Sequence, residues 1–474
     1  MNCSHRSPSR GKAGLYGIIK SCPLYVHRRS VIFKKNMWVE ELNLENIKCF
    51  DKLKLPCGDK NGAFKWITLL GENGVGKSTI LQALGLLLAG PDGANQLLTK
   101  PLGWLRDEKN AGKISAKIHK EEKDPGVYGD KKQRAVFNFT YFITGTEEIK
   151  IRSKIYTEPA IVPNSDRTLS WLRQNAFQAK GKGWFASGYG AFRRLTKRNQ
   201  VIVPSLQSPE RFTGFLAQFN EDEPLAAFEQ WFVHLDYRMA KKDDALAKKQ
   251  QQLGIAAINR VLPEGNKFDS VRTDGKILFD VNGQKVATLN LSDGYRSVLA
   301  LAGDLIWRLF MAFPESDDPM QEHGTVLIDE LDIHLHPVWQ RQIPGMLRKL
   351  FPNLQFIVST HSPFIASGSG DDAITYRLNR TAGQIELTKI QNMAFLSVEK
   401  VLQSDAFEVV SLFSKETQMR IDRYYTLRKK IKRTPLEDSQ LVMDMPIVEQ
   451  AIGLDAPKSD LENKMDQYLN KMLK

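Results

Sequence analysis

A glycine-rich stretch in the first fifth of the chain decides the fold. It reads Gly71-Glu72-Asn73-Gly74-Val75-Gly76-Lys77-Ser78-Thr79 and matches every fixed position of the phosphate-binding pattern G-x-x-x-x-G-K-[ST]. Residues 64–70 before it have the composition of a β-strand, and the apolar run 80–88 after it is typical of a helix. Because strand, loop and helix follow in the required order, the stretch predicts a nucleoside triphosphate site rather than a simple turn.

The chemistry of this loop assigns a role to each residue type. Main-chain N–H groups curl around a polyphosphate at the start of a helix, where the helix dipole also favours anions. Lys77 is expected to reach the β- and γ-phosphates, and the Ser78 hydroxyl to ligate Mg²⁺. The residues expected to contact the nucleotide are therefore Gly71, Asn73, Gly74, Gly76, Lys77, Ser78 and Thr79.

A second apolar run, residues 325–328, ends in the two carboxylates Asp329 and Glu330, which is the Walker B pattern. A buried parallel strand would deliver both groups to the carboxyl edge of the sheet, beside the phosphate loop. Asp329 is expected to hold Mg²⁺ through water, and Glu330 to act as the catalytic base that orients and deprotonates the attacking water. Such a run is common by chance, but together with the phosphate loop it predicts hydrolysis.

Two further segments extend the predicted site. Ser292 and Gly294 open a helix whose N-terminal amides and serine hydroxyl suit a γ-phosphate, although a serine that caps an ordinary helix gives the same pattern. The apolar run 356–359 leads to His361, which stands 32 residues after Asp329. A single histidine is usually a surface or core residue, but its place after a buried strand favours a functional one.

In this order the four motifs resemble those of the ATP-binding-cassette and structural-maintenance-of-chromosomes (SMC) ATPases, over about residues 38–90 and 285–367. The resemblance implies an α/β P-loop head that binds ATP. It also implies that Ser292 and Gly294 act on the ATP held by the opposite protomer, and that His361 is a catalytic switch residue at the γ-phosphate. Asp293 and Tyr295 depart from the family signature L-S-G-G-Q.

Two other segments indicate a branch of this class. Residues 331–337, which contain Asp332, His334 and His336, resemble the H-L-H-P segment of the overcoming-lysogenization-defect ATPases, at a position that crosses the dimer interface. An interface role is favoured over a metal site, because no third ligand is evident. Residues 185–194 resemble a segment of stand-alone phage-defence ATPases such as the Septu type. Two interpretations of Arg193 and Arg194 are equally favoured: contact with nucleotide or DNA phosphates, or simple exposure at the end of a strand.

The tail after His361 contains no D-x-D pair of the kind that Toprim nuclease domains use, and no H-N-H motif is found. The resemblance therefore implies that a separate nuclease, most plausibly of the H-N-H type, does any cutting. The basic stretch 424–433 is compatible with a contact to DNA or to that partner, but a plain surface helix is favoured.

Composition sets the boundaries of the molecule. The chain has 474 residues and a net charge of +13, of which residues 1–36 carry eight positive charges and no acidic residue. That segment reads as a basic nucleic-acid arm, a transit peptide or, as we favour, an over-extended gene start before Met37. We expect an ATPase head over 37–367, with an inserted lobe of strands and helices at about 160–270, and a mostly helical region over 368–474.

The remaining composition predicts a cytoplasmic protein. No apolar run approaches the roughly 20 residues that cross a bilayer. The four cysteines lack CxxC spacing and fit a reducing compartment.

Three functions compete on this evidence. The leading one is an ATPase that closes as a homodimer, or a higher even oligomer, over two ATP molecules and controls a nuclease in phage defence. The alternative is a DNA-repair or recombination ATPase that clamps DNA directly. A transporter subunit is disfavoured by the H-L-H-P segment and by the large insertion.

Overall fold

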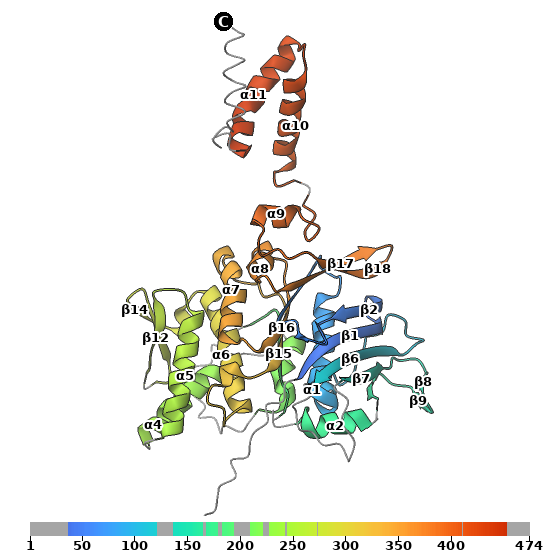
Figure 1. Ribbon diagram of the computed structural model, residues 1–474, viewed down its shortest axis with the longest axis vertical. Helices are drawn as coiled ribbons and strands as arrows, with labels where there is room; N and C mark the ends of the chain where they lie inside the picture. Colours follow the sequence, from blue (N-terminus) through green and yellow to red (C-terminus); the bar gives the residue numbers. More distant parts are fainter. Residues whose placement is uncertain are drawn as a thin grey trace, which may run out of the picture. The chain divides into compact units, whose positions relative to one another are not determined.

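The computed structural model describes residues 37–120, 136–164, 167–178, 183–193, 209–220, 227–241, 244–272, 274–409 and 411–452. The predictions for residues 1–36 and for Arg194 lie outside this part. The described chain is an α/β protein, as expected, with two large sheets and helices packed against them (Figure 1). Within the described ranges, no helix has the length and apolar character needed to cross a membrane.

The central sheet carries the predicted motifs. Its strands lie in the order β11 (Phe185–Tyr189), β15 (Gly324–Ile328), β16 (Leu354–Ser359), β5 (Trp66–Gly71), β17 (Ile374–Thr381) and β18 (Gln384–Ile390). All neighbouring pairs are parallel except the last. Every residue of β15 and β16 is buried, which explains why both strands are mainly apolar. Because these strands are parallel, the segments that follow β5, β15 and β16 meet at one edge of the sheet.

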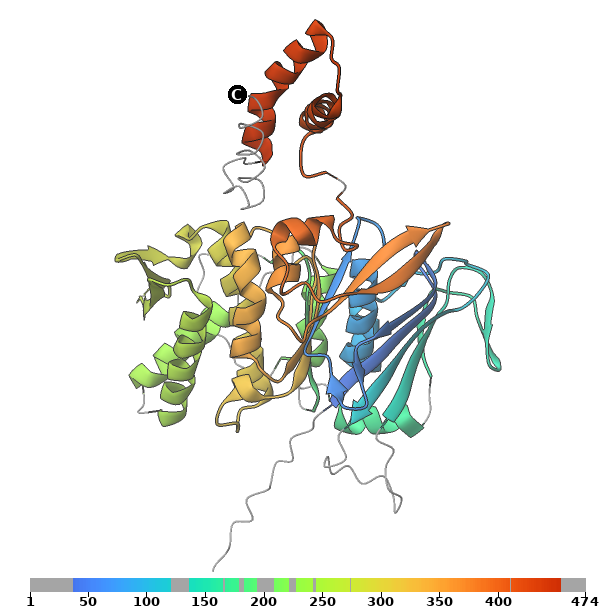
Figure 2. The same ribbon diagram turned by 45° about the horizontal axis from the view of Figure 1, so that its top comes forward.

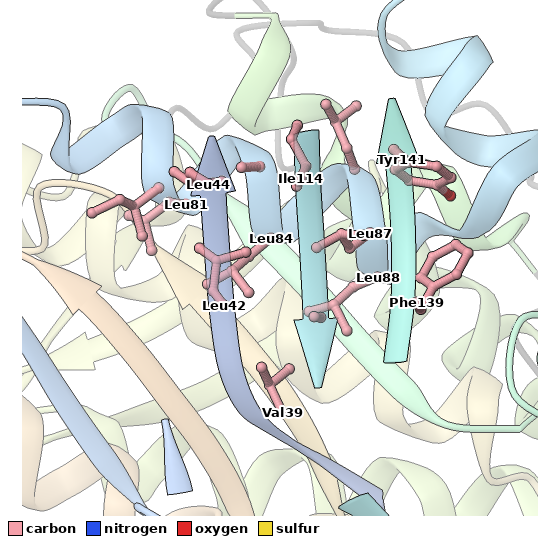
Figure 3. Close-up of a cluster of buried hydrophobic side chains, with 14 of the residues drawn as sticks. Val39, Leu42, Leu44, Leu81, Leu84, Leu87, Leu88, Ile114, Phe139 and Tyr141 are labelled. Carbon is pink, nitrogen blue, oxygen red and sulfur yellow. The ribbon is translucent and has the colours of Figure 1, made fainter. Parts of the chain in front are cut away.

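A second, antiparallel sheet lies on the other side of the phosphate-loop helix α1 (Lys77–Leu97). Figure 3 shows the buried contact, in which leucines of α1 face Leu42, Ile114 and Tyr141 of three neighbouring strands. The strand order is β10 (Ile161–Pro163), β7 (Val136–Ile143), β6 (Gly112–Lys120), β1 (Met37–Ile47) and β2 (Phe50–Pro56). Short elements complete this region: β3 (Gly58–Asp59), β4 (Gly62–Ala63), β8 (Ile149–Ile151), β9 (Lys154–Tyr156) and α2 (Arg167–Asn175).

The buried side chain of Gln355 joins the two sheets. Its amide nitrogen donates to the carbonyls of Val39 at 3.2 Å and Cys57 at 2.7 Å. Its oxygen accepts from the Val39 N–H at 3.3 Å and the Thr325 hydroxyl at 3.2 Å. This one polar residue therefore fixes the antiparallel sheet against the strand that leads to the catalytic segment.

The sequence predicts an interruption of α1 at Gly90, but the helix resumes after a kink and ends at Leu97. Gly90 takes a left-handed conformation with φ 80°, and a Cβ there would meet Phe177 at 2.9 Å. Pro91 then starts the second segment, where its missing N–H costs little. The Gly-Pro pair thus redirects the helix instead of ending it.

The lobe beyond the central sheet contains helices and a small sheet, as predicted. Its elements are α3 (Leu216–Phe219), α4 (Ala227–Lys241), α5 (Ala245–Val261), β12 (Asn266–Val271), β13 (Ile277–Val281) and β14 (Gln284–Ala287). Asn282 and Gly283, a residue pair typical of hairpin turns, join β13 to β14 with φ 51° and 84°. However, β11 lies inside the expected insertion and yet pairs with β15, so residues 185–189 belong to the central sheet. The other limits of the insertion stay predictions.

The mostly helical region expected over 368–474 begins, in the part that the structure describes, with two strands. β17 pairs with β5 and β18 with β17, so the central sheet extends past the expected head boundary to Ile390. Helices α9 (Val398–Gln403), α10 (Lys415–Lys429) and α11 (Pro435–Ile452) follow (Figure 2). α10 and α11 form a hairpin around their own small core of Ile421, Tyr424 and Val448.

Candidate nucleotide-binding site

The phosphate loop has the shape that its glycines predict. Gly74 and Gly76 take left-handed φ values of 78° and 95°. A Cβ on Gly76 would meet the Cys49 sulfur at 2.5 Å, whereas a Cβ on Gly74 would meet nothing within 4 Å. Packing beneath the loop thus requires a glycine at position 76, whereas the space beside Gly74 is open. The start of α1 has neither a side-chain cap nor an acidic residue, so its N–H groups suit an anion.

Lys77 is placed for the role predicted for it. Its ammonium donates to the carbonyls of Gly71 at 2.8 Å and Glu72 at 2.9 Å, and the residue is 6% exposed. Burial lowers the pKa of Lys77, while Asp329 and Glu330 oppose that shift. The charges that surround the lysine therefore come from the Walker B segment. Ser78 is half-buried, Thr79 is buried, and Asn73 is exposed at the tip of the loop.

Ser359, the last residue of β16, contacts both Walker B residues, through the carboxylate of Asp329 and the main chain of Glu330. Its hydroxyl donates to the Asp329 carboxylate and accepts the main-chain N–H of Glu330 at 2.8 Å. Its carbonyl accepts the Leu331 N–H at 3.0 Å. Ser359 was not predicted as a site residue, although a hydroxyl at the end of an apolar strand two residues before His361 is a readable signal.

Glu330 has an unusual backbone conformation, with a left-handed φ of 46°. Such a conformation costs about 1–3 kcal/mol in a non-glycine residue and is often found at functional sites. The Arg193 guanidinium donates to the carbonyls of Asp329 at 2.7 Å and Glu330 at 2.9 Å, and to Gly190 at 2.8 Å. Hydrogen bonds from a charged donor contribute about 1.5–3 kcal/mol each, so this set is large enough to offset the strain.

Arg193 corrects the sequence interpretation. The residue is 3% exposed and bonded to main-chain carbonyls, so it is neither a surface arginine nor free to reach a phosphate. Burial lowers its pKa to about 10, which leaves the guanidinium charged at neutral pH.

The carboxylate of Glu330 has the electrostatic setting of a base. Partial burial raises its pKa first, and the nearby Asp329 and Asp332 raise it further, against the opposing effects of Lys77 and Arg193. A raised pKa makes the ionised carboxylate a better proton acceptor.

His361 joins the same cluster. Its main-chain N–H donates to Asp332 at 3.3 Å, and the Thr360 hydroxyl donates to the same carboxylate. The pKa of His361 is lowered by partial burial and then by Lys77. The structure therefore brings together Lys77, Asp329, Glu330 and His361, as the sequence predicts.

The segment after Glu330 is held from helix α7 (Pro337–Leu350). The Gln340 amide donates to the carbonyls of Asp332 at 3.2 Å and Leu335 at 2.9 Å, and its oxygen accepts from Ser362 at 2.6 Å. His336 caps α7 through its ring nitrogen. Among the residues described by the structure, no group of three or more His, Cys, Asp or Glu side chains is placed to hold a metal.

The start of α6 (Asp293–Ala312) lies against this same segment, since a Cβ on Gly294 would meet the His334 carbonyl at 3.1 Å. Ser292 occupies the N-cap position, yet its side chain makes no capping hydrogen bond and is exposed. An ordinary serine cap would use that hydroxyl. The action of Ser292 and Gly294 on a second protomer stays a prediction.

The residues present fit an ATP–Mg²⁺ complex. The glycine loop leaves open space above uncapped helical N–H groups, Lys77 supplies positive charge, and Asp329 has its orientation fixed by Ser359. Ser78 and Asp329 are the residues that would hold the ion.

The fold and the site define a P-loop ATPase of the ATP-binding-cassette and SMC type. Residues 67–367 match a protein family described as "AAA domain, putative AbiEii toxin, Type IV TA system", and the chain belongs to this family. The predicted ATPase activity and ATP binding are thereby supported by fold, site and family together.

Several known proteins are similar to the chain. A retron Vc95 probable ATPase from Vibrio cholerae serotype O1 biovar El Tor is 46% identical over 406 residues, covering 73% of this chain and 75% of that protein. A Septu protein PtuA from Bacillus mycoides (strain KBAB4) is 26% identical, and the match covers 83% of this chain and 48% of that protein. A Septu protein PtuA from Bacillus thuringiensis is 29% identical, and the match covers 71% of this chain and 78% of that protein. The chain thus spans about half the length of the Bacillus mycoides protein. The predicted resemblance to Septu-type ATPases is confirmed.

Among solved structures, an Smc head bound to the C-winged helix domain of ScpA is similar at 13% identity, with a TM-score of 0.45 over 75% of this chain and 98% of that one.

Proposed function

We propose that this ATPase works in the cytoplasm as a homodimer that closes over two ATP molecules. Its single-chain site holds a base and a lysine, and Ser292 and Gly294 of the opposite protomer would supply a second set of phosphate contacts. The uncommitted Ser292 hydroxyl supports this arrangement. The start of α6 also lies beside the H-L-H-P segment, the part that the resemblance puts at the dimer interface.

Hydrolysis would proceed at the carboxyl edge of the central sheet. The Glu330 carboxylate takes a proton from a water as that water attacks the γ-phosphorus, and the bond to the ADP oxygen breaks. Lys77 balances charge on the β- and γ-phosphates, and His361 contacts the γ-phosphate. Mg²⁺, when held by Ser78 and Asp329, would supply further positive charge to the phosphate oxygens. The observation that carries this role is the raised pKa of Glu330 beside Lys77, on a turn fixed by Ser359.

The dimer is tested by light scattering of the full chain with and without ATP, for the wild type and for Glu330→Gln. We expect Glu330→Gln to accumulate as an ATP-dependent dimer, because it binds ATP without hydrolysing it. Ser292→Arg should abolish that dimer, whereas Ser439→Arg, which changes an exposed serine on α11, should not. A protein that stays monomeric in every condition would refute the two-site arrangement.

For the biological setting, we propose control of a separate nuclease in phage defence, as the relatives named Septu protein PtuA suggest. The identity of 46% to a retron ATPase favours a second candidate, the ATPase component of a retron system. The two are distinguished by the proteins that co-purify with the tagged chain when the neighbouring genes are expressed. Capture of an H-N-H nuclease and loss of protection on its deletion would support the Septu-like role. Turnover stimulated by duplex DNA alone would favour direct DNA clamping instead.

A further inference from the structure

The loop after β11 contributes a buried cation to the catalytic turn. Arg193 directs its guanidinium at three main-chain carbonyls, two of which belong to Asp329 and Glu330. The phosphate-site motifs described above do not include this residue, and its Nε has no hydrogen-bond partner within the described residues. A fully buried guanidinium is costly unless it is well paired. Packing alone therefore does not explain why the Arg193 guanidinium lies at the catalytic turn.

The turn is held from β11 in two ways. The carbonyl of Tyr189, the last residue of β11, accepts the Asp329 N–H at 2.8 Å. Four residues later the Arg193 side chain donates to the carbonyls of Asp329 and Glu330, which belong to the next two peptide units. Between these two attachments Glu330 is kept in its left-handed conformation, which most residues avoid.

We propose that Arg193 is a positioning residue for hydrolysis, which fixes the main chain of Asp329 and Glu330 so that the Glu330 carboxylate faces the attacking water. Arg193 touches neither nucleotide nor water and acts only through the turn. This role rests on Glu330 being the base, as proposed above. It also explains why an arginine is used, because the guanidinium offers several donors in a fixed plane and can reach three carbonyls at once.

The central test is Arg193→Met in the full chain, compared with Arg193→Lys. We expect Arg193→Met to lower kcat at least 30-fold while KM and the affinity for ATP change less than threefold, because the phosphate loop is untouched. Arg193→Lys should recover part of kcat, since an ammonium restores the charge and one or two of the bonds. A fall in ATP affinity that matches the fall in kcat would overturn the proposal.

Arg211 provides a matched control, because it is also buried and also donates to main-chain carbonyls, those of Leu88 at 2.7 Å and Trp184. Arg193→Met and Arg211→Met should both lose thermal stability, but only Arg193→Met should lower kcat more than threefold. Equal losses of kcat in the two variants would reduce Arg193 to a structural residue and overturn the proposal.

The Glu330→Gln variant distinguishes the positioning role of Arg193 from the assignment of Glu330 as the catalytic base. If Glu330→Gln keeps its turnover, the assignment of the base is wrong. If Glu330→Gln loses turnover and Arg193→Met keeps it, the positioning role alone is wrong. Should Arg193→Met fail to fold, Arg193→Lys decides, with a kcat loss of about tenfold at near wild-type stability expected and a wild-type kcat refuting the role.

Discussion

Replacing Ser359 by alanine removes a hydroxyl that serves Asp329 and Glu330 together. The hydroxyl donates to one carboxylate and accepts the N–H of the next residue at 2.8 Å, in a side chain with no exposed surface. A buried N–H without a partner costs about 1–3 kcal/mol, and a hydrogen bond to a charged group contributes a similar amount. We therefore expect the free energy of unfolding to fall by about 2–4 kcal/mol. If half of that free energy, about 1–2 kcal/mol, is also lost from the transition state, kcat falls about 5- to 30-fold.

The assay measures ATP turnover against Mg²⁺ concentration, together with urea unfolding. Ser359→Ala should need more Mg²⁺ for half-maximal turnover, because the Asp329 carboxylate is no longer oriented. The control is Ser369→Ala, which changes the residue directly after helix α8 (Pro363–Gly368). Its hydroxyl is also buried and donates to the Ile365 carbonyl at 2.7 Å, away from the Walker B residues. Ser369→Ala should lose stability without a change in kcat. A wild-type kcat and Mg²⁺ dependence in Ser359→Ala would refute the reasoning.

Three further outcomes follow from the structure. Gln355→Leu should lower the free energy of unfolding by about 2–4 kcal/mol in urea titrations, because buried main-chain groups of the antiparallel sheet lose their partner. Gly76→Ala should weaken nucleotide binding at least tenfold in a binding titration, since its Cβ would meet the Cys49 sulfur at 2.5 Å. The control Gly383→Ala, at φ 82° in open space, should leave nucleotide binding unchanged. The raised pKa of Glu330 means that stability falls as pH rises above 4.5 towards the folded-state pKa. Glu330→Gln should therefore raise Tm at pH 7, by at most about 2 °C for a partly exposed group, and leave Tm unchanged near pH 4.

The phosphate loop and the Walker B carboxylates could be predicted because their determinants are local. Gly76, Lys77 and the strand before them are contiguous in sequence, so spacing alone defines the loop. Asp329 and His361 each follow a continuous apolar run, and the parallel arrangement of such runs brings their ends together. β11 shows the limit of this reasoning. A strand pattern such as that of residues 185–189 does not tell which sheet the strand joins, so the insertion expected at about 160–270 includes a strand of the central sheet.

The partners of the catalytic turn could not be predicted, because they are main-chain groups that every residue possesses. Once the turn is known, however, its buried N–H and C=O groups must all be paired. The N–H groups of Asp329 and Glu330 are taken by Tyr189 and Ser359, which end the two strands beside β15. Both strand ends are then used, so the Asp329 carbonyl needs a donor from outside the sheet, and Arg193 supplies it. The same guanidinium donates to the Glu330 carbonyl, which also accepts the Ile333 N–H at 3.2 Å. An arginine a few residues beyond the strand next to Walker B is thus better interpreted as a partner for that turn than as a phosphate ligand.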